Sequence, residues 1–185
     1  MKNLKILTLF ALVFSGCSQP TQWAQEQRVE FISSLNPYRQ MAYLNELDDA
    51  EFVVFTSDVS ADIESAYPVY TQFVMMPSLS DTVDMWIVGA IVDQLDADAS
   101  NMRYLYPYHT LVAQGILPAG LDRAARLSFY RCFAQKINNK FMTLESFFYA
   151  VITNDIDPNE ITTMQRDCAS ELFNFTVVAQ AVRVW

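Results

Sequence analysis

The sequence predicts an all-α protein whose folded part is a single bundle-like helical domain. Three observations indicate this fold class. Apolar residues recur at steps of three and four in most segments of the 185-residue chain. Capping residues stand before several of these segments. Glycine occurs only four times, and long Ser/Pro/Gly-rich linkers are missing from the sequence.

The N-terminus has the three-part order of an export signal. Lys2 and Lys5 precede an apolar run over 6–14, and Ser15 and Gly16 are small residues before Cys17. A nine-residue run is too short for a membrane-spanning helix, which needs about 20 residues. The chain is therefore expected to be exported rather than held by a permanent span.

Residues 14–17, Phe-Ser-Gly-Cys, resemble the lipobox of bacterial lipoproteins, although Phe14 stands where that family usually has leucine. The resemblance implies cleavage between Gly16 and Cys17, a thioether-linked diacylglyceryl group on Cys17 and acylation of the new amine. Two or three acyl chains anchor a protein durably, whereas one does so only marginally. The alternative is an ordinary signal peptide followed by a chance cysteine.

The same resemblance implies how the chain is divided and where in the cell it is located. Residues 1–16 are the removed signal peptide, 17–22 the lipidated tether, and 23–185 the helical domain. In enteric-type lipoproteins an aspartate after the lipidated cysteine favours retention at the inner membrane. Ser18 stands there, so the expected location is the periplasmic face of the outer membrane, with the inner membrane as the alternative.

The first elements of the domain are expected to be helical, with one uncertain region. Residues 22–35 predict one helix, and Asn36–Pro37 opens a second that runs to about Leu47. The segment 51–79 gives the weakest signal, because two prolines interrupt it. Residues Glu51–Phe55 favour β-structure by composition, so a short strand pair near 52–56 is an open alternative.

The middle of the chain predicts a buried helix capped by Ser80. Its apolar residues between 83 and 92 cover most of the helix circumference, although a run this short also fits a core strand. Asp98 is expected to open the next helix, with a kink at Pro107 and an end at Gly115.

The C-terminal part predicts three helices. One carries an apolar stripe from Leu121 through Phe129, Cys132 and Phe133 and ends near Asn138–Asn139, and a short one begins at Thr143. The third has Asp157 as N-cap, Pro158 at its first position and Glu160 completing a capping box. Its stripe comprises Ile161, Met164, Cys168, Leu172, Phe175, Ala179 and Val182.

Cys132 and Cys168 remain once Cys17 carries lipid, and both lie on predicted core-facing stripes. In an oxidising compartment such a pair is expected to form a disulfide that cross-links the two helices. Two buried free thiols are the alternative.

Charge restricts the partners. Without residues 1–16 the chain has 10 basic and 21 acidic residues, a formal net charge of −11. Such a chain repels nucleic acid, so no nucleic-acid partner is expected, and the lipid rather than charge is expected to hold it at the membrane.

No cofactor, metal ion or catalytic set is indicated by the sequence. His109 is the only histidine, and the acidic run over 154–160 fails the spacing of a calcium loop. The expected partner surface is Arg103, Tyr104, Tyr106, Tyr108 and His109, where aromatic and cationic side chains concentrate around Pro107. The alternative is ordinary packing of a kinked helix.

A second concentration of charge comprises Arg123, Arg126, Arg131, Lys136 and Lys140. It predicts either an anion-binding face or a solvated helix face paired with acidic neighbours. The expected function is that of an envelope binding or assembly accessory protein that recognises a protein partner. The alternative is a cell-envelope hydrolase that uses His109 and a carboxylate.

Overall fold

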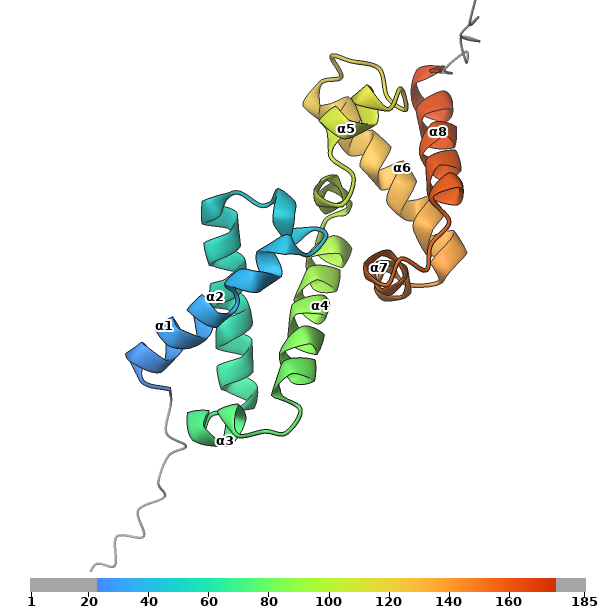
Figure 1. Cartoon of the computed structure of the whole chain (residues 1–185). Helices are drawn as coiled ribbons and strands as arrows, with labels where there is room; N and C mark the ends of the chain where they lie inside the picture. Colours follow the sequence, from blue (N-terminus) through green and yellow to red (C-terminus); the bar gives the residue numbers. More distant parts are fainter. Residues whose placement is uncertain (1–22, 176–185) are drawn as a thin grey trace, which may run out of the picture.

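The structure, a computed structural model, describes residues 23–175, and these residues contain helices and no strand. Figure 1 shows two lobes. The N-lobe, residues 23–97, contains α1 (Gln25–Ser34), α2 (Asp49–Ala66), α3 (Tyr70–Val74) and α4 (Leu79–Ala97). The C-lobe, residues 98–175, contains η3 (Ala99–Tyr104), α5 (Tyr108–Ala113), α6 (Arg123–Phe141), α7 (Leu144–Ile152) and α8 (Pro158–Phe173). The all-α prediction is confirmed.

The alternative of a short strand pair near 52–56 is wrong, because these residues lie in α2. Asp48 caps the helix by accepting a hydrogen bond from the Glu51 amide at 2.8 Å, and the Glu51 carboxylate accepts one from the Asp48 amide at 3.0 Å. This capping box fixes the first turn. From there Phe52, Phe55, Val59 and Ile63 are buried at helical spacing, so packing outweighs β-propensity.

Residues 36–47 do not form the single helix that was expected. They form two short 3₁₀ segments, η1 (Asn36–Gln40) and η2 (Leu44–Glu46). Tyr43 lies between them with φ of 80°, a conformation that an α-helix does not accommodate. Its ring is fully buried and its hydroxyl donates to Gln94 Oε1 at 2.7 Å, so α4 holds this turn in place.

The expected buried helix after residue 80 is α4, and the strand alternative for 83–92 is wrong. Its N-cap is Ser78 instead of Ser80, and the Ser78 side chain makes no capping hydrogen bond. The expected kink at Pro107 is a complete break between η3 and α5. Asp98 caps η3 as expected, because its Oδ1 accepts from the Ser100 amide at 2.8 Å.

Side-chain caps begin the three long C-lobe elements. Asp122 accepts from the Ala125 amide at 2.8 Å, Thr143 from the Ser146 amide at 3.0 Å, and Asp157 from the Asn159 amide at 2.9 Å. The caps at Thr143 and Asp157 were expected. The Glu160 carboxylate does not complete the predicted box but lies 2.5 Å from Lys140 Nζ.

The predicted disulfide is confirmed. Cys132 of α6 and Cys168 of α8 are joined at an S–S distance of 2.03 Å, with their Cα atoms 5.9 Å apart. Lys136 Nζ lies 2.7 Å from Glu171 Oε1 and adds an ion pair between the same helices. α8 ends at Phe173, and Leu172, expected on the core stripe, is 43% exposed. Ala179 and Val182 lie outside the described residues.

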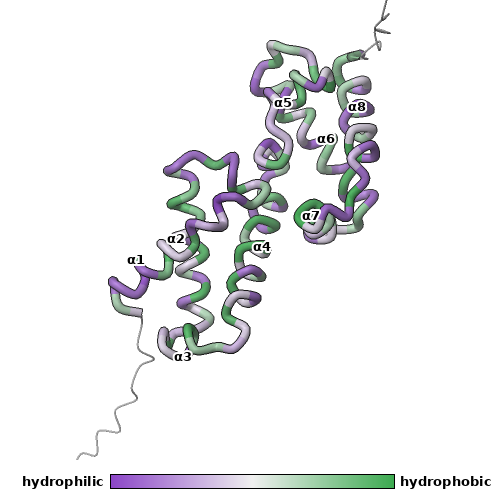
Figure 2. The backbone as a smooth tube through the Cα atoms, viewed as in Figure 1, coloured by the Kyte–Doolittle hydropathy of each residue, from purple (hydrophilic) through white to green (hydrophobic). Residues whose placement is uncertain are grey.

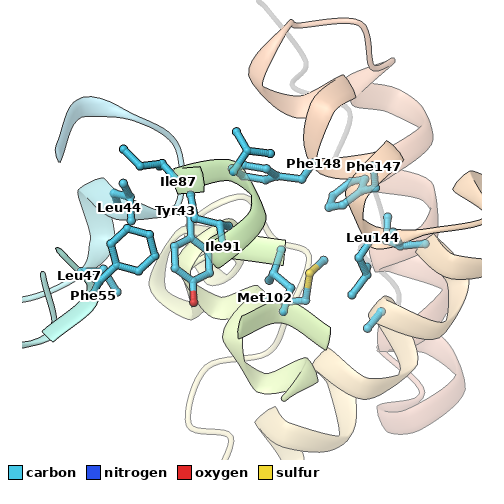
Figure 3. Packing of buried hydrophobic residues seen from close by; sticks show 14 of the residues in the cluster. Tyr43, Leu44, Leu47, Phe55, Ile87, Ile91, Met102, Leu144, Phe147 and Phe148 are labelled. Atoms are coloured by element: carbon cyan, nitrogen blue, oxygen red, sulfur yellow. The ribbon is translucent and has the colours of Figure 1, made fainter. Parts of the chain in front are cut away.

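One hydrophobic core crosses the boundary between the lobes. Figure 3 shows Ile87 and Ile91 of α4 between two groups of buried side chains. The N-lobe group is Tyr43, Leu44, Leu47 and Phe55, and the C-lobe group is Met102, Leu144, Phe147 and Phe148. α7, hydrophobic over much of its length in Figure 2, supplies three residues of the second group. The lobes are therefore packed together and not joined by a loose linker.

Candidate functional site

The five residues of the expected partner surface do not form one surface. Arg103 and Tyr104 end η3, whereas Tyr108 and His109 begin α5 beyond the break at Pro107. Tyr106 lies in the short connection between them. The structure therefore gives each of these side chains a different environment.

Tyr106 packs into the C-lobe core. Its ring centroid lies 5.2 Å from that of Phe133 in an edge-to-face arrangement and 6.5 Å from that of Phe147. Burial raises the pKa of its phenol. Its backbone carbonyl also accepts a hydrogen bond from the Tyr130 hydroxyl at 2.8 Å. This residue follows the packing alternative.

Tyr108 holds the loop between α5 and α6. Its hydroxyl donates to the Pro118 carbonyl at 2.8 Å and accepts from the Leu121 amide at 2.9 Å. The Arg126 guanidinium lies over its ring at 5.0 Å from the centroid. One face of the ring is thus used to place an arginine.

Tyr104 connects the two lobes through a chain of polar groups. Its hydroxyl donates to Glu51 Oε1 at 2.5 Å and accepts from Arg103 Nη2 at 2.5 Å. The Arg103 guanidinium also stacks over the Tyr104 ring at 4.2 Å from the centroid. Burial, followed by the hydrogen bond to Glu51, raises the pKa of the Tyr104 phenol.

A cleft of about 550 Å³ opens beside these residues, between η3, α5 and the first half of α6. We call it the arginine cleft. Its lining residues are Glu46, Asp98, Ser100, Arg103, Tyr104, Pro107, Tyr108, Arg123, Arg126, Leu127 and Tyr130. Three of the five predicted surface residues therefore line it, whereas Tyr106 and His109 do not.

The start of α6 decides which side chains face the cleft. The Asp122 cap sets the helix so that Arg123, Arg126 and Leu127 follow at steps of three and four and share one side. Arg103 reaches the same cleft from η3, where its Nη1 donates to the Ser100 carbonyl at 3.3 Å. Three arginines from two elements therefore line one cleft.

These three arginines form no ion pair with a carboxylate within residues 23–175. The ion pairs of the described residues are Arg28–Glu64, Arg39–Asp49, Lys136–Glu171 and Lys140–Glu160. Four of the five basic residues over 123–140 thus divide into two groups, and Arg131 belongs to neither. The two lysines pair with α8, whereas Arg123 and Arg126 line the arginine cleft.

Two carboxylates also line the cleft, and neither forms an ion pair with one of its three arginines. Hydrogen bonds from Ser100 lower the pKa of the Asp98 carboxyl, and Arg103 and Arg131 lower it further through their charge. Asp98 is thus ionised and committed to capping η3. Glu46 is the second acid and comes from the N-lobe.

His109 is exposed and makes no hydrogen bond or ion pair with a carboxylate within the described part of the chain. No cluster of three or more potential metal ligands occurs in residues 23–175.

Comparison of the chain with protein-family models, curated proteins and solved structures returned no match. Among the helices of residues 23–175, none is both long enough and apolar enough to cross a membrane. Gly16, Cys17 and the tether over 17–22 lie outside the described residues, so the lipobox expectation stays a prediction.

Sequence reasoning missed Tyr130, Leu127 and Glu46 as cleft residues. Leu127 and Tyr130 follow Arg123 and Arg126 at helical spacing, so projecting the predicted helix onto a wheel would have placed them on the same side. Glu46 approaches from another lobe, and no signal in the sequence indicates that approach.

Proposed function

We propose that this protein is a lipid-anchored lipoprotein of the bacterial outer membrane, facing the periplasm, that binds an anionic segment of an envelope protein in the arginine cleft. The observation that carries the binding role is that Arg103, Arg123 and Arg126 line one cleft and that none of them is paired with a carboxylate in residues 23–175, in a chain of formal net charge −9. The anchoring role is carried by the lipobox-like residues 14–17.

The chemistry of the cleft fits a carboxylate-bearing peptide. Guanidinium groups bind carboxylates in bidentate geometry, and hydrogen bonds to charged groups contribute about 1.5–3 kcal/mol each. The rings of Tyr104, Tyr108 and Tyr130 add rigid apolar area with polar tips, which suits side-chain recognition. Because Tyr104 and Tyr108 position Arg103 and Arg126, those cations lose little conformational entropy on binding.

The anchor restricts where the partner is found. A tether over 17–22 spans about 20 Å at full extension, so the folded body stays close to the membrane surface. A partner captured by the cleft is therefore expected to lie in or beside the outer membrane.

The test of the binding role is crosslinking in intact envelopes followed by affinity capture. Wild-type protein is expected to retain a defined partner, and the Arg123→Ser/Arg126→Ser variant is expected to lose about 100-fold or more in affinity for it, which corresponds to two charged contacts of about 1.5 kcal/mol or more each. Arg166→Ser removes an arginine from α8, outside the cleft, and is the matched control. Equal capture by all three proteins would refute the cleft as the binding site.

The anchor is tested separately. Cys17→Ser is expected to abolish labelling by a palmitate analogue and to leave an unprocessed or mislocalised precursor. Labelling of this variant at the wild-type level would refute the lipid assignment. It would not refute the binding role of the arginine cleft, which the capture experiment tests separately.

A further inference from the structure

A second hollow lies between α2 and α4 of the N-lobe, and acidic rather than basic side chains flank it. It has a volume of about 330 Å³, and we call it the α2/α4 groove. Its lining residues are Val59, Asp62, Tyr67, Met85, Trp86, Gly89, Ala90 and Asp93. The proposed function makes no use of these residues.

The groove is apolar along its length and acidic at its edges. Val59 is buried, Trp86 and Ala90 are half-buried, and Met85 is 67% exposed. Asp62 and Asp93 are exposed, one on each helix. An apolar surface with a flexible methionine suits a partner helix, because the thioether side chain adapts to different shapes.

Gly89 is the most informative residue of the groove. It lies in the interior of the 19-residue helix α4, where glycine is less favourable than alanine. A Cβ atom built at this position would meet no heavy atom within 4 Å, so the packing of residues 23–175 gives no reason for a glycine. Glycine at such a place lets another backbone or side chain approach the helix closely.

Charge identifies the occupant. Residues 23–97 contain 13 acidic and 2 basic residues, a formal net charge of −11. The two basic residues, Arg28 and Arg39, are already in ion pairs with Glu64 and Asp49. An amphipathic helix with lysine or arginine on its polar face would therefore meet carboxylates and no free cation of this lobe.

We propose that the α2/α4 groove binds a basic amphipathic helix of a partner protein, with the apolar face of that helix over Gly89 and its cations beside Asp62 and Asp93. The site is independent of the arginine cleft, because the two hollows share no lining residue. The protein then has two binding surfaces of opposite charge preference.

The probe is a short fluorescent amphipathic helix of leucine and lysine, titrated by anisotropy against the full chain with Cys17→Ser. Gly89→Leu is expected to weaken binding about tenfold or more, because leucine fills the groove, while the melting temperature stays equal or rises. Ala61→Leu adds the same side chain on the exposed part of α2 outside the groove and is expected to leave affinity unchanged. Asp62→Asn and Asp93→Asn are each expected to weaken binding about threefold.

Three results would overturn the proposal. Equal affinity of the Gly89→Leu and Ala61→Leu proteins would show that the peptide binds the acidic lobe without using the groove. A wild-type dimer that Gly89→Leu dissociates in sedimentation would identify a second copy as the occupant. A rise in peptide affinity after removal of residues 176–185 would identify that segment as the occupant.

Discussion

The N-lobe and the C-lobe are similar in length but opposite in how they use charge. The N-lobe has a formal net charge of −11, whereas residues 98–175 contain 8 acidic and 7 basic residues, a net of −1. Both cations of the N-lobe are paired, while three arginines of the C-lobe line an open cleft. The negative net charge of the chain therefore comes almost entirely from the N-lobe, and the C-lobe is nearly neutral.

The lobes also differ in what holds them together. In the N-lobe, Trp23, Phe31 and Phe73 pack with ring centroids 5.3–5.5 Å apart, and Arg28 forms an ion pair with Glu64 at 2.6 Å. In the C-lobe, a disulfide and two lysine–glutamate ion pairs connect α6 to α8. Substitutions that remove each of these interactions separate the contributions of the two lobes to stability.

The largest effect is expected where the lobes meet. Phe148 is fully buried beside α4, and Phe148→Ala is expected to lower the free energy of unfolding by about 3–5 kcal/mol. Because the core is shared, hydrogen exchange should accelerate in both lobes. Faster exchange confined to the C-lobe would show that the lobes unfold independently.

Removal of the disulfide is expected to cost about 4 kcal/mol, from the loss of a cross-link over 36 residues. The comparison is Cys132→Ser/Cys168→Ser against Cys17→Ser in chemical denaturation. Because the lobes share a core, exchange should accelerate in both, and it should accelerate most in α6 and α8, which lose their direct cross-link. A loss of protection of equal size in α1 and α2 would contradict the assignment of this device to one lobe.

Helix caps give a smaller, matched comparison. Asp48 caps α2 in the N-lobe and Asp122 caps α6 in the C-lobe, each through a hydrogen bond of 2.8 Å. Each substitution by alanine is expected to cost about 1 kcal/mol. Asp48→Ala should cost slightly less than Asp122→Ala, because the backbone amide of residue 48 still donates to the Glu51 carboxylate and holds the first turn. Urea denaturation of both variants measures the difference, and a larger cost for Asp48→Ala would contradict this account.

The smallest effect is expected from Glu64, and it depends on pH. Hydrogen bonds from Arg28, and then one from the Trp23 amide, hold the pKa of its carboxyl below the ordinary value of 4.5. A lowered pKa in the folded state stabilises the fold above pH 4.5 and ceases to do so as the pH falls through the folded-state value.

Glu64→Gln should therefore be less stable than the wild type at pH 7, and the difference should shrink as the pH is lowered below 4.5. Glu26→Gln, on the exposed surface of α1, is the control. A difference that stays constant from pH 7 to pH 3 would mean that the ion pair does not carry the effect.

The sequence predicted the C-lobe better than the N-lobe, for a physical reason. Asp157, Pro158 and Thr143 are local signals, and they mark the helix starts that the structure has. In the N-lobe, Asp48 and Glu51 form a capping box that the sequence prediction did not use, and the strand-like residues Glu51–Phe55 left a strand pair as an alternative. The turn at Tyr43 depends on burial against α4 and on a hydrogen bond to Gln94, which local sequence does not encode.

Of the candidate site, the cationic and aromatic residue types were predicted but their grouping was not. Tyr104 and Tyr108 line the cleft together with Arg103, whereas Tyr106 packs in the core against the rings of Phe133 and Phe147. Sequence predicted a kink at Pro107 but not the direction that each ring takes.

The most direct test of the segregated charges uses two fluorescent peptides on one set of proteins. A leucine–lysine helix and a glutamate- and tyrosine-rich peptide are each titrated against wild type, Gly89→Leu and Arg123→Ser/Arg126→Ser. We expect Gly89→Leu to weaken only the basic peptide and the double arginine variant to weaken only the acidic one. Equal losses of both peptides in either variant would contradict separate sites on the two lobes.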